Sequence, residues 1–376
     1  MVVAAATVWF GASAAQIIRS GGFNDFSVIV SGASDLASGR SPYDAEASRD
    51  FGRRSSYIYP PFLATVVMPV RRFGPSLARA YAVLGVLLYL AAFVLILETE
   101  GIAWRSPPFY GLALAFALFE PALDTLSGAE HEFLFLFLFV LVQYSLRRHP
   151  RAQSLMGICL ALGAIVKIYP ACLVAYAALR RWWIAVFAFA MTFGVLTAIS
   201  VSVVGWRIER QYWQDILPVL ARGTDWIENQ SLLGFFSRFF VDGRAFYAEP
   251  PVLPSATVLA RIAGLVITAI TAVVIWRYDR PERVMAALLP LLLLIAPVAW
   301  MNYELLLLLP LGILAGLLWK EPHRGRTALL LCSALIVAFG DGCDLTYRPQ
   351  WIFESYKFFG VLGFWVSGVW ALAQPV

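Results

Sequence analysis

The sequence predicts an all-α polytopic membrane protein. Hydrophobic residues make up 60% of the 376 residues and charged residues only 14%, with a mean hydropathy of +0.72. A soluble domain of this length needs a more polar surface. The apolar residues also occur in runs that approach the roughly 20 residues of a transmembrane helix. These observations exclude a soluble protein, and we expect a single membrane domain over residues 1–376.

About a dozen apolar segments are long enough to be read as spans. The first lacks the basic flank of a signal peptide, so we expect it to be retained as a helix. The sequence Lys167-Ile168-Tyr169-Pro170 interrupts two short segments, which we expect to form the arms of a hairpin. The expected spans are residues 2–18, 76–97, 107–122, 132–146, 154–166, 170–179, 183–204, 256–276, 284–298, 303–319, 326–340 and 351–373.

Short basic loops set the expected orientation. Four of them lie on one side of the membrane if the N-terminus is cytoplasmic, and the positive-inside rule makes that side the cytoplasm. Residues 57–69 hold a double proline and about a dozen apolar residues, so we expect an interfacial helix there rather than a span. The first loop (19–75), with interfacial helices, and the long loop (205–255) then face the extracytoplasmic side. The basic loops contain Arg147, Arg148 and Arg151; Arg180 and Arg181; Arg277, Arg280 and Arg283; and Lys320, Arg324 and Arg326.

The excess of basic over acidic residues does not indicate a nucleic-acid partner. The formal net charge is +5, but the basic residues form short clusters between apolar segments rather than one face. Cys159, Cys172 and Cys332 lie in apolar runs and Cys343 lies in a loop, so neither a disulfide framework nor a metal motif is indicated. The sequence leaves open whether a divalent cation is needed.

Asp25 is the most informative carboxylate of the first outer loop. It precedes the stretch FSVIVSGASDLASG, whose apolar spacing fits a short amphipathic helix at the interface that ends at Gly39. Asp25 fits the N-terminal cap of that helix. It fits equally a general base held where a membrane lipid and a water-side acceptor meet. The residues alone leave both interpretations open.

Glu130, His131 and Glu132 form a second polar group, at the mouth of an apolar hairpin. Acidic residues beside a span are costly unless they line a cavity, so they are functional candidates; a helix-start cap or a solvated loop is the alternative. No HExxH motif is present, and three consecutive helical residues cannot all face one ion. Lys167 suits the phosphate of a lipid carrier, although snorkelling to the interface is the commoner use of such a lysine.

The long loop supplies paired amides beside a tryptophan. Asn229 and Gln230 follow Trp226, and such residues suit a sugar because amides donate and accept hydrogen bonds while the indole covers apolar sugar faces. The spans 76–97 and 183–204 are almost free of charge, whereas coupled transporters more often bury charges at mid-membrane. The pattern therefore favours sugar transfer from a lipid donor over ion transport.

Five stretches in a fixed order resemble the polyprenol-phosphate-sugar-dependent glycosyltransferases of the GT-C architecture, most closely glycosyltransferase family 87. They are NDFSVIVSGASDLASGRSPYD, YIYPPFLATVVMPV, VKIYP, ENQSLLGFFSRFF and APVAWMNYELLLLLP. The resemblance covers nearly the whole chain and implies a GT-C-like bundle in a bacterial plasma membrane. It implies an inverting enzyme that takes a sugar, typically mannose, from a polyprenyl-phosphate carrier on the extracytoplasmic side.

The resemblance also implies roles for particular residues. Asp25 would deprotonate the acceptor hydroxyl, and Lys167 and Arg238 would hold the donor phosphate, whose departure needs positive charge nearby. The chain departs from the family pattern where Gly128-Ala129-Glu130-His131 replaces Gly-Gln-x-Asn, and where residues 302 and 303 replace histidines, which leaves the sugar and the acceptor open. The residues expected to bind sugar or acceptor are Tyr59, Glu130, His131, Asn229, Gln230, Trp300, Asn302 and Tyr303.

Two other functions remain as alternatives. A lipid-linked sugar flippase or transporter needs no general base, so Asp25 would be dispensable. An intramembrane hydrolase has only Ser127, close to His131 in sequence, as a hint. The partners expected of the transferase are the polyprenyl-phosphate-sugar donor, a lipid or glycan acceptor and membrane lipids.

Overall fold

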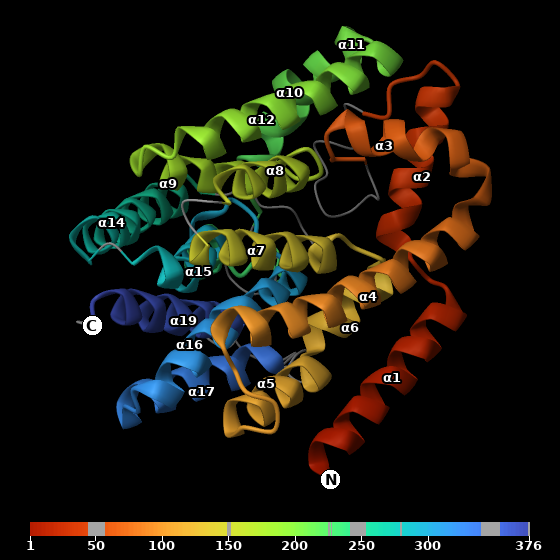
Figure 1. Cartoon of the computed structure of the whole chain (residues 1–376). Helices are drawn as coiled ribbons and strands as arrows, with labels where there is room; N and C mark the ends of the chain where they lie inside the picture. The colour runs from red at the N-terminus through yellow and green to blue at the C-terminus, as the bar shows by residue number, and fades with distance from the viewer. Residues whose placement is uncertain are drawn as a thin grey trace. The chain divides into compact units, whose positions relative to one another are not determined.

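The predicted all-α architecture is confirmed. In a computed structural model of the chain, all regular elements of the described residues are helices (Figure 1). The chain divides into two compact units, one built from Met1–Ala12, Phe93–Leu123 and Arg222–Val376 and the other from Ser13–Ala92 and Asp124–Ala221. We call them unit 1 and unit 2; the expected single domain stays a prediction. The described residues are 1–43, 57–148, 152–224, 226, 228–240, 253–278, 280–339 and 354–374.

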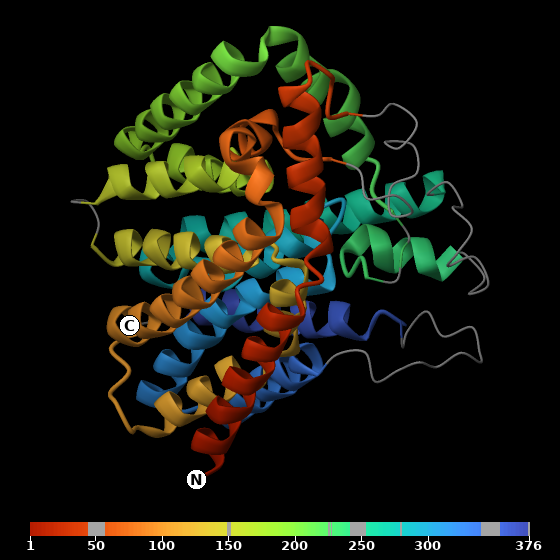
Figure 2. The same cartoon turned by 90° about the vertical axis from the view of Figure 1, so that its right-hand side faces the viewer.

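Unit 2 is centred on three neighbouring helices. Helix α8 lies between α7 and α10, as Figures 1 and 2 both show. Gly157 permits close packing here, because a side chain at this position would overlap the backbone carbonyl of Ala185 on α10. The helices wholly or largely in this unit are α2 (Asn24–Ala37), α3 (Pro61–Val67), η1 (Met68–Phe73), α4 (Gly74–Glu100), α6 (Glu120–Gly128), α7 (Glu132–Arg147), α8 (Gln153–Ala164), η2 (Tyr169–Leu173), α9 (Val174–Leu179), α10 (Trp183–Val204), α11 (Trp206–Gln211), η3 (Tyr212–Ile216) and α12 (Leu217–Leu220).

Unit 1 is organised around its last helix. Helix α19 packs against α15 and α17, and Gly368 lies directly on the backbone of Ala286 in α15. Helix α13 packs on α14. The helices of this unit are the start of α1 (Val2–Ser20), α5 (Pro107–Leu118), α13 (Leu232–Phe240), α14 (Pro254–Tyr278), η5 (Pro281–Arg283), α15 (Met285–Ile295), η6 (Met301–Leu307), α16 (Leu308–Lys320), α17 (Arg324–Ala338) and α19 (Tyr356–Leu372).

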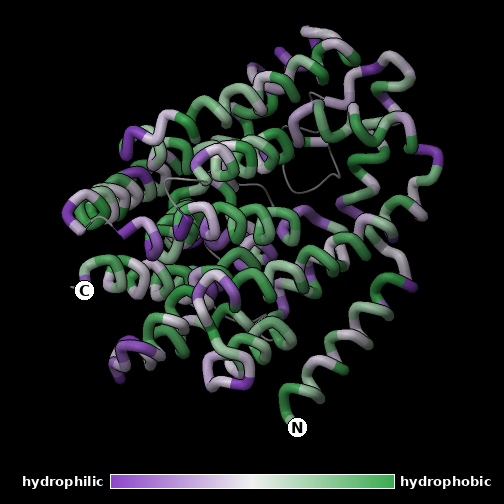
Figure 3. Tube along the Cα trace, in the orientation of Figure 1, coloured by the Kyte–Doolittle hydropathy of each residue, from purple (hydrophilic) through white to green (hydrophobic). Residues whose placement is uncertain are grey.

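Six helical segments of the described chain are long and apolar enough to cross a membrane. The remaining expected spans are shorter, among them Gln153–Ala164 and Tyr356–Leu372. Figure 3 shows hydrophobic colour along most of these helices, with hydrophilic residues gathered mainly at their ends and turns. The six segments are Val2–Ala37, Pro61–Glu100, Pro107–Gly128, Trp183–Val204, Pro254–Tyr278 and Met301–Lys320.

Several expected boundaries are revised. The span predicted over 107–122 consists of two helices, because the backbone is extended at Phe119 between α5 and α6. Helix α15 ends at Ile295 rather than 298, since Ala296 precedes a proline and is extended, with ψ of 141°. The seven residues of α3 cannot cross a bilayer alone, in line with the helix expected over 57–69. Residues 341–350, which join the last two expected spans, lie outside the described residues.

Candidate active site

Helix α2 carries Asp25 in its first turn. The N-cap position is Phe23, and no side chain caps the helix. The interpretation of Asp25 as the helix cap is therefore wrong. The helix expected in this stretch is present and ends before Gly39, whose φ of 72° is one that glycine adopts readily. Asp25 is left with a partly buried carboxylate within electrostatic reach of Lys167 and Glu132.

The turn between α6 and α7 presents Glu130 and His131. The amides of Ala129 and Glu130 donate back to the carbonyls of Leu126 and Thr125, which is the double hydrogen bond of a Schellman motif. Ala129 occupies the left-handed position of this motif with a φ of 50°, where glycine is the usual residue. The motif ends α6 and directs the chain into α7.

Lys167 lies at the helix break that follows α8. Its ammonium nitrogen is 2.7 Å from Oε1 of Glu132 and 3.9 Å from Oε2 of Glu130. The lysine side chain is only 11% exposed, and its nitrogen lies over the rings of Tyr59 and Phe135 at 5.7 and 5.9 Å from their centroids. The snorkelling interpretation is therefore wrong, because this lysine faces a group of carboxylates and aromatic rings.

Asp25 and Glu130 approach each other across Gly128. A Cβ atom at Gly128 would lie 2.5 Å from Oδ2 of Asp25 and 3.2 Å from Oε1 of Glu130. Both oxygens thus lie near one point, where the glycine leaves space for them. Burial, followed by the negative charge of Glu132, raises the pKa of Glu130 well above its usual value. A carboxyl group in this setting is protonated more readily than one in water.

His131 is the N-cap residue of α7 but makes no side-chain cap. Its Nδ1 is 2.6 Å from the hydroxyl of Tyr81, whereas its buried Nε2 has no hydrogen-bond partner among the described residues. Burial and then the charge of Lys167 lower the pKa of His131 well below its usual value, so the ring is neutral near pH 7. The Ser127 hydroxyl donates to the carbonyl of Asp124 rather than to His131.

Unit 1 holds a second polar group, formed by Asn229 and its neighbours. The Asn229 amide donates to the carbonyls of Thr224 and Pro297 and accepts from the amides of Ser231 and Ala299. These four bonds use the full hydrogen-bonding capacity of the side chain. Asn229 therefore ties the end of the long loop to the segment that follows α15.

Gln230 and Arg238 make further ties within unit 1. Gln230 donates to the carbonyl of Glu354 and accepts from the amide of Phe358. The guanidinium of Arg238 donates to the Ser355 hydroxyl and to the carbonyls of residues 226 and 229. Both side chains thus join the long loop to the start of α19, and in this arrangement they bind protein groups.

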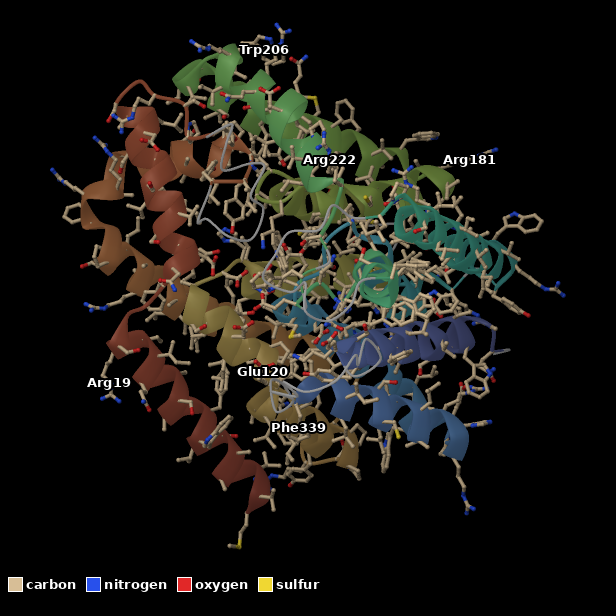
Figure 4. The ribbon with its side chains drawn as sticks, turned by 180° about the vertical axis from the view of Figure 1, so that it is seen from behind. Arg19, Glu120, Arg181, Trp206, Arg222 and Phe339 are labelled. Carbon is tan, nitrogen blue, oxygen red and sulfur yellow. The ribbon has the colours of Figure 1, made fainter. Side chains whose placement is uncertain are left out.

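Asn302 lies in η6 of the same unit. Its side chain is 2% exposed, and neither its amide nitrogen nor its oxygen has a partner among the described residues. On the same short helix, Glu304 is 3.5 Å from the buried ammonium of Lys357, which also bonds Glu120 at 3.0 Å. Glu120 is labelled in Figure 4. Unit 1 thus contains a buried lysine between two carboxylates that the sequence analysis did not single out.

The comparison with known families decides the class of protein. A sequence profile of glycosyltransferase family 87 matches residues 57–297, which include Glu130, Lys167 and the loop around Asn229 but not Asp25. The chain belongs to glycosyltransferase family 87. It is therefore an integral membrane glycosyltransferase, and the predicted family is confirmed.

A known relative of this family 87 chain is similar along much of its length. It is the polyprenol-phosphate-mannose-dependent alpha-(1-2)-phosphatidylinositol mannoside mannosyltransferase of Mycobacterium tuberculosis (strain ATCC 25618 / H37Rv). The two are 25% identical over 312 residues, which cover 76% of this chain and 68% of the relative.

The structure distributes the predicted site residues of the family 87 chain between its two units. In unit 2 it gathers Asp25, Tyr59, Glu130, His131 and Lys167. In unit 1 it holds Asn229, Gln230, Arg238, Trp300, Asn302 and Tyr303.

Some polar residues in these two groups escaped the sequence analysis. Tyr81 was missed because a tyrosine in a span gives no signal, whereas Lys357 and Glu304 interrupt apolar runs and could have been noticed. Among the described residues, no group of three or more His, Cys, Asp and Glu side chains is arranged to hold a metal ion.

Proposed function

We propose that this chain transfers a mannosyl residue from a polyprenyl-phosphate carrier to a lipid or glycan acceptor on the extracytoplasmic face, with inversion at the anomeric carbon. The observation that carries the proposal is the cluster that brings a carboxylate, Asp25, and an ammonium, Lys167, into one electrostatic environment in unit 2. Family membership supplies the reaction class. The name of the mycobacterial relative supports this donor and a lipid acceptor.

The reaction needs both charges. Asp25 removes the proton from the acceptor hydroxyl, and the oxygen attacks the anomeric carbon as the bond to the donor phosphate breaks. Lys167 stabilises the negative charge that builds on the departing phosphate. A single displacement by the acceptor inverts the configuration of the sugar.

Glu132 prepares Lys167 for this task. Its carboxylate is fully buried and 2.7 Å from the ammonium, so it holds the lysine side chain in place before the donor arrives. Glu132 Oε2 has no hydrogen-bond partner among the described residues. An ion pair of this kind is preorganised, because little side-chain freedom is left to lose when the phosphate binds.

The direction of α7 supports an extracytoplasmic site. The helix begins at Glu132 beside the cluster and ends at Arg147 in a basic loop. Because basic loops stay in the cytoplasm, the beginning of α7 faces the other side. In Figure 4, Arg181 and Trp206 mark the two ends of α10, which separates another basic loop from the outer segments in the same way.

In unit 1 we propose that Trp300, Asn302 and Tyr303 contact the sugar or the acceptor. The buried amide of Asn302 has hydrogen-bonding capacity that no described residue uses, and sugar hydroxyls match it. Asn229, Gln230 and Arg238 are proposed to act indirectly, because their side chains bind the backbone and Ser355.

The test is sugar transfer by the purified full-length protein in lipid, with radiolabelled polyprenyl-phosphate mannose and a panel of lipid and glycan acceptors. Asp25→Asn is expected to lower the rate by about 100-fold or more, the usual effect of losing a general base. Asp35→Asn is the matched control, because this aspartate lies on the same helix and pairs only with the exposed Arg40 at 2.7 Å among the described residues.

Each outcome decides between functions. Transfer by the wild type that collapses in Asp25→Asn but not in Asp35→Asn supports the transferase and its base. Transfer that survives Asp25→Asn would show that Asp25 is not the general base. Movement of the labelled lipid across the bilayer without transfer would replace the enzyme with a flippase.

A further inference from the structure

Glu130 has no part in the chemistry described so far, although it lies beside both charged groups, Asp25 and Lys167. One of its oxygens approaches Asp25 across Gly128, and the other is 3.9 Å from the ammonium of Lys167. The side chain is only 16% exposed. It thus lies between the proposed base and the proposed phosphate ligand.

The polar atoms around Glu130 indicate a place for a ligand. His131 is 1% exposed, and its Nε2 has no partner among the described residues. Oε2 of the fully buried Glu132 is likewise without a hydrogen-bond partner there. Unsatisfied buried polar atoms are costly, so their presence beside a charged cluster marks a site that a polar ligand completes.

The charge of the cluster limits how a phosphate can enter it. Among the described residues, three carboxyl groups, on Asp25, Glu130 and Glu132, lie near the ammonium of Lys167. A phosphodiester brings a further negative charge, which three ionised carboxylates would repel. One carboxyl group that carries a proton reduces this repulsion and offers a hydrogen-bond donor to the phosphate.

Burial favours Glu130 as the protonated group. The pKa of Glu130 is raised first by burial and then by Glu132, and only Lys167 opposes these effects. The charged groups that act on Glu130 are Asp25 of α2, Asp124 of α6, Glu132 of α7 and Lys167 after α8, and Glu130 in turn acts on Tyr81 of α4. His131, the next residue in the chain, is acted on by Lys167.

We propose that Glu130 is a second catalytic residue, the general acid that protonates the departing phosphate while Asp25 takes the proton of the acceptor hydroxyl. This inference rests on the proposed function. The acceptor oxygen forms the new bond to the anomeric carbon as the bond from that carbon to the phosphate oxygen breaks. Its electron pair stays on the phosphate oxygen, which receives the proton of Glu130.

A proton transfer between the two carboxyl groups then restores their starting protonation states. After transfer Asp25 carries a proton and Glu130 does not, and the two oxygens face each other across Gly128. Passage of the proton from Asp25 to Glu130 returns both groups to their starting states. In the balance, the proton of the acceptor hydroxyl ends on the polyprenyl phosphate, and the protein gains and loses none.

The test compares Glu130→Gln with the wild type in the transfer assay. The amide keeps the shape and can donate a hydrogen bond but cannot give up a proton, so kcat is expected to fall by about 100-fold while the donor KM changes little. The wild-type kcat is expected to fall as pH rises and Glu130 loses its proton, and this limb of the profile disappears in Glu130→Gln. Glu98→Gln, at an exposed site on α4, is the control expected to match the wild type.

A second measurement needs no variant. Rates of the wild type in mixtures of H₂O and D₂O are expected to curve, because two protons move in the transition state; a linear dependence would mean that one moves and would overturn the inference. Unchanged kcat and pH profile in Glu130→Gln would overturn it too, while leaving the transferase intact if Asp25→Asn is inactive. Absence of transfer by the wild type with every acceptor would instead refute the proposed function.

Discussion

Gly128→Ala tests the placement of the proposed base most directly. The added methyl group would lie 2.5 Å from Oδ2 of Asp25 and 2.9 Å from Cγ of Glu130, both shorter than any ordinary contact. To reach an ordinary contact of 3.4 Å, the Asp25 oxygen must withdraw by about 0.9 Å. A displacement of about 1 Å at a reacting group can lower a rate by about 100-fold. We therefore expect kcat to fall by that order.

The assay is mannosyl transfer by the full-length protein in lipid, combined with a melting temperature to exclude misfolding. Gly194→Ala is the matched control, because this glycine lies in α10 with nothing within 4 Å of the added methyl group. On an Asp25→Asn background, Gly128→Ala is expected to have little further effect, since the displaced group is already inactive. Wild-type kcat in a well-folded Gly128→Ala protein would refute the placement of Asp25.

Three further predictions concern stability. Lys357→Met removes the buried ammonium that pairs with Glu120 and with the buried Glu304, and it is expected to lower the free energy of unfolding by about 3–5 kcal/mol. Arg40→Met, at a side chain 68% exposed, should change the free energy of unfolding by less than about 1 kcal/mol, and equal melting temperatures of the two variants would contradict this. Asn229→Ala removes four hydrogen bonds to backbone groups and should destabilise by at least about 2 kcal/mol in a denaturation experiment. The lowered pKa keeps the buried His131 neutral in the folded protein, whereas His131 of the unfolded chain binds a proton as the pH falls below about 6.5. The free energy of unfolding therefore decreases below that pH, and it should decrease less in the His131→Asn variant.

Composition and the lengths of the apolar segments were sufficient to predict most of the fold. The helix at 183–204 was predicted to the residue, because it is a single uninterrupted apolar run. The breaks were harder: the interruption at Phe119 was missed although Glu120 and Pro121 follow it, because the apolar run on either side was read as one span. The 3₁₀ geometry of η6 was missed because an apolar helical run does not distinguish 3₁₀ from α turns.

The candidate site was predictable where charge interrupts apolar sequence. Asp25, Glu130 and Lys167 stand out for that reason, and the structure places them together. Asn229 was identified by residue type, but its structural contacts are with the backbone, because amides bind peptide groups as readily as sugar hydroxyls. The partner of His131, Tyr81, lies 50 positions away, and nothing in the sequence links the two.

The short arms of the hairpin around Lys167 have a consequence for the surrounding lipid. Helix α8 has 12 residues, which span about 18 Å, whereas the hydrocarbon layer of a typical bilayer is about 30 Å thick. We expect local thinning of the bilayer to relieve this hydrophobic mismatch and to bring headgroup phosphates closer to the lysine. The acyl-chain length of the surrounding lipids would then affect the enzyme, because bilayers of shorter chains would place a lipid-linked phosphate nearest to its site.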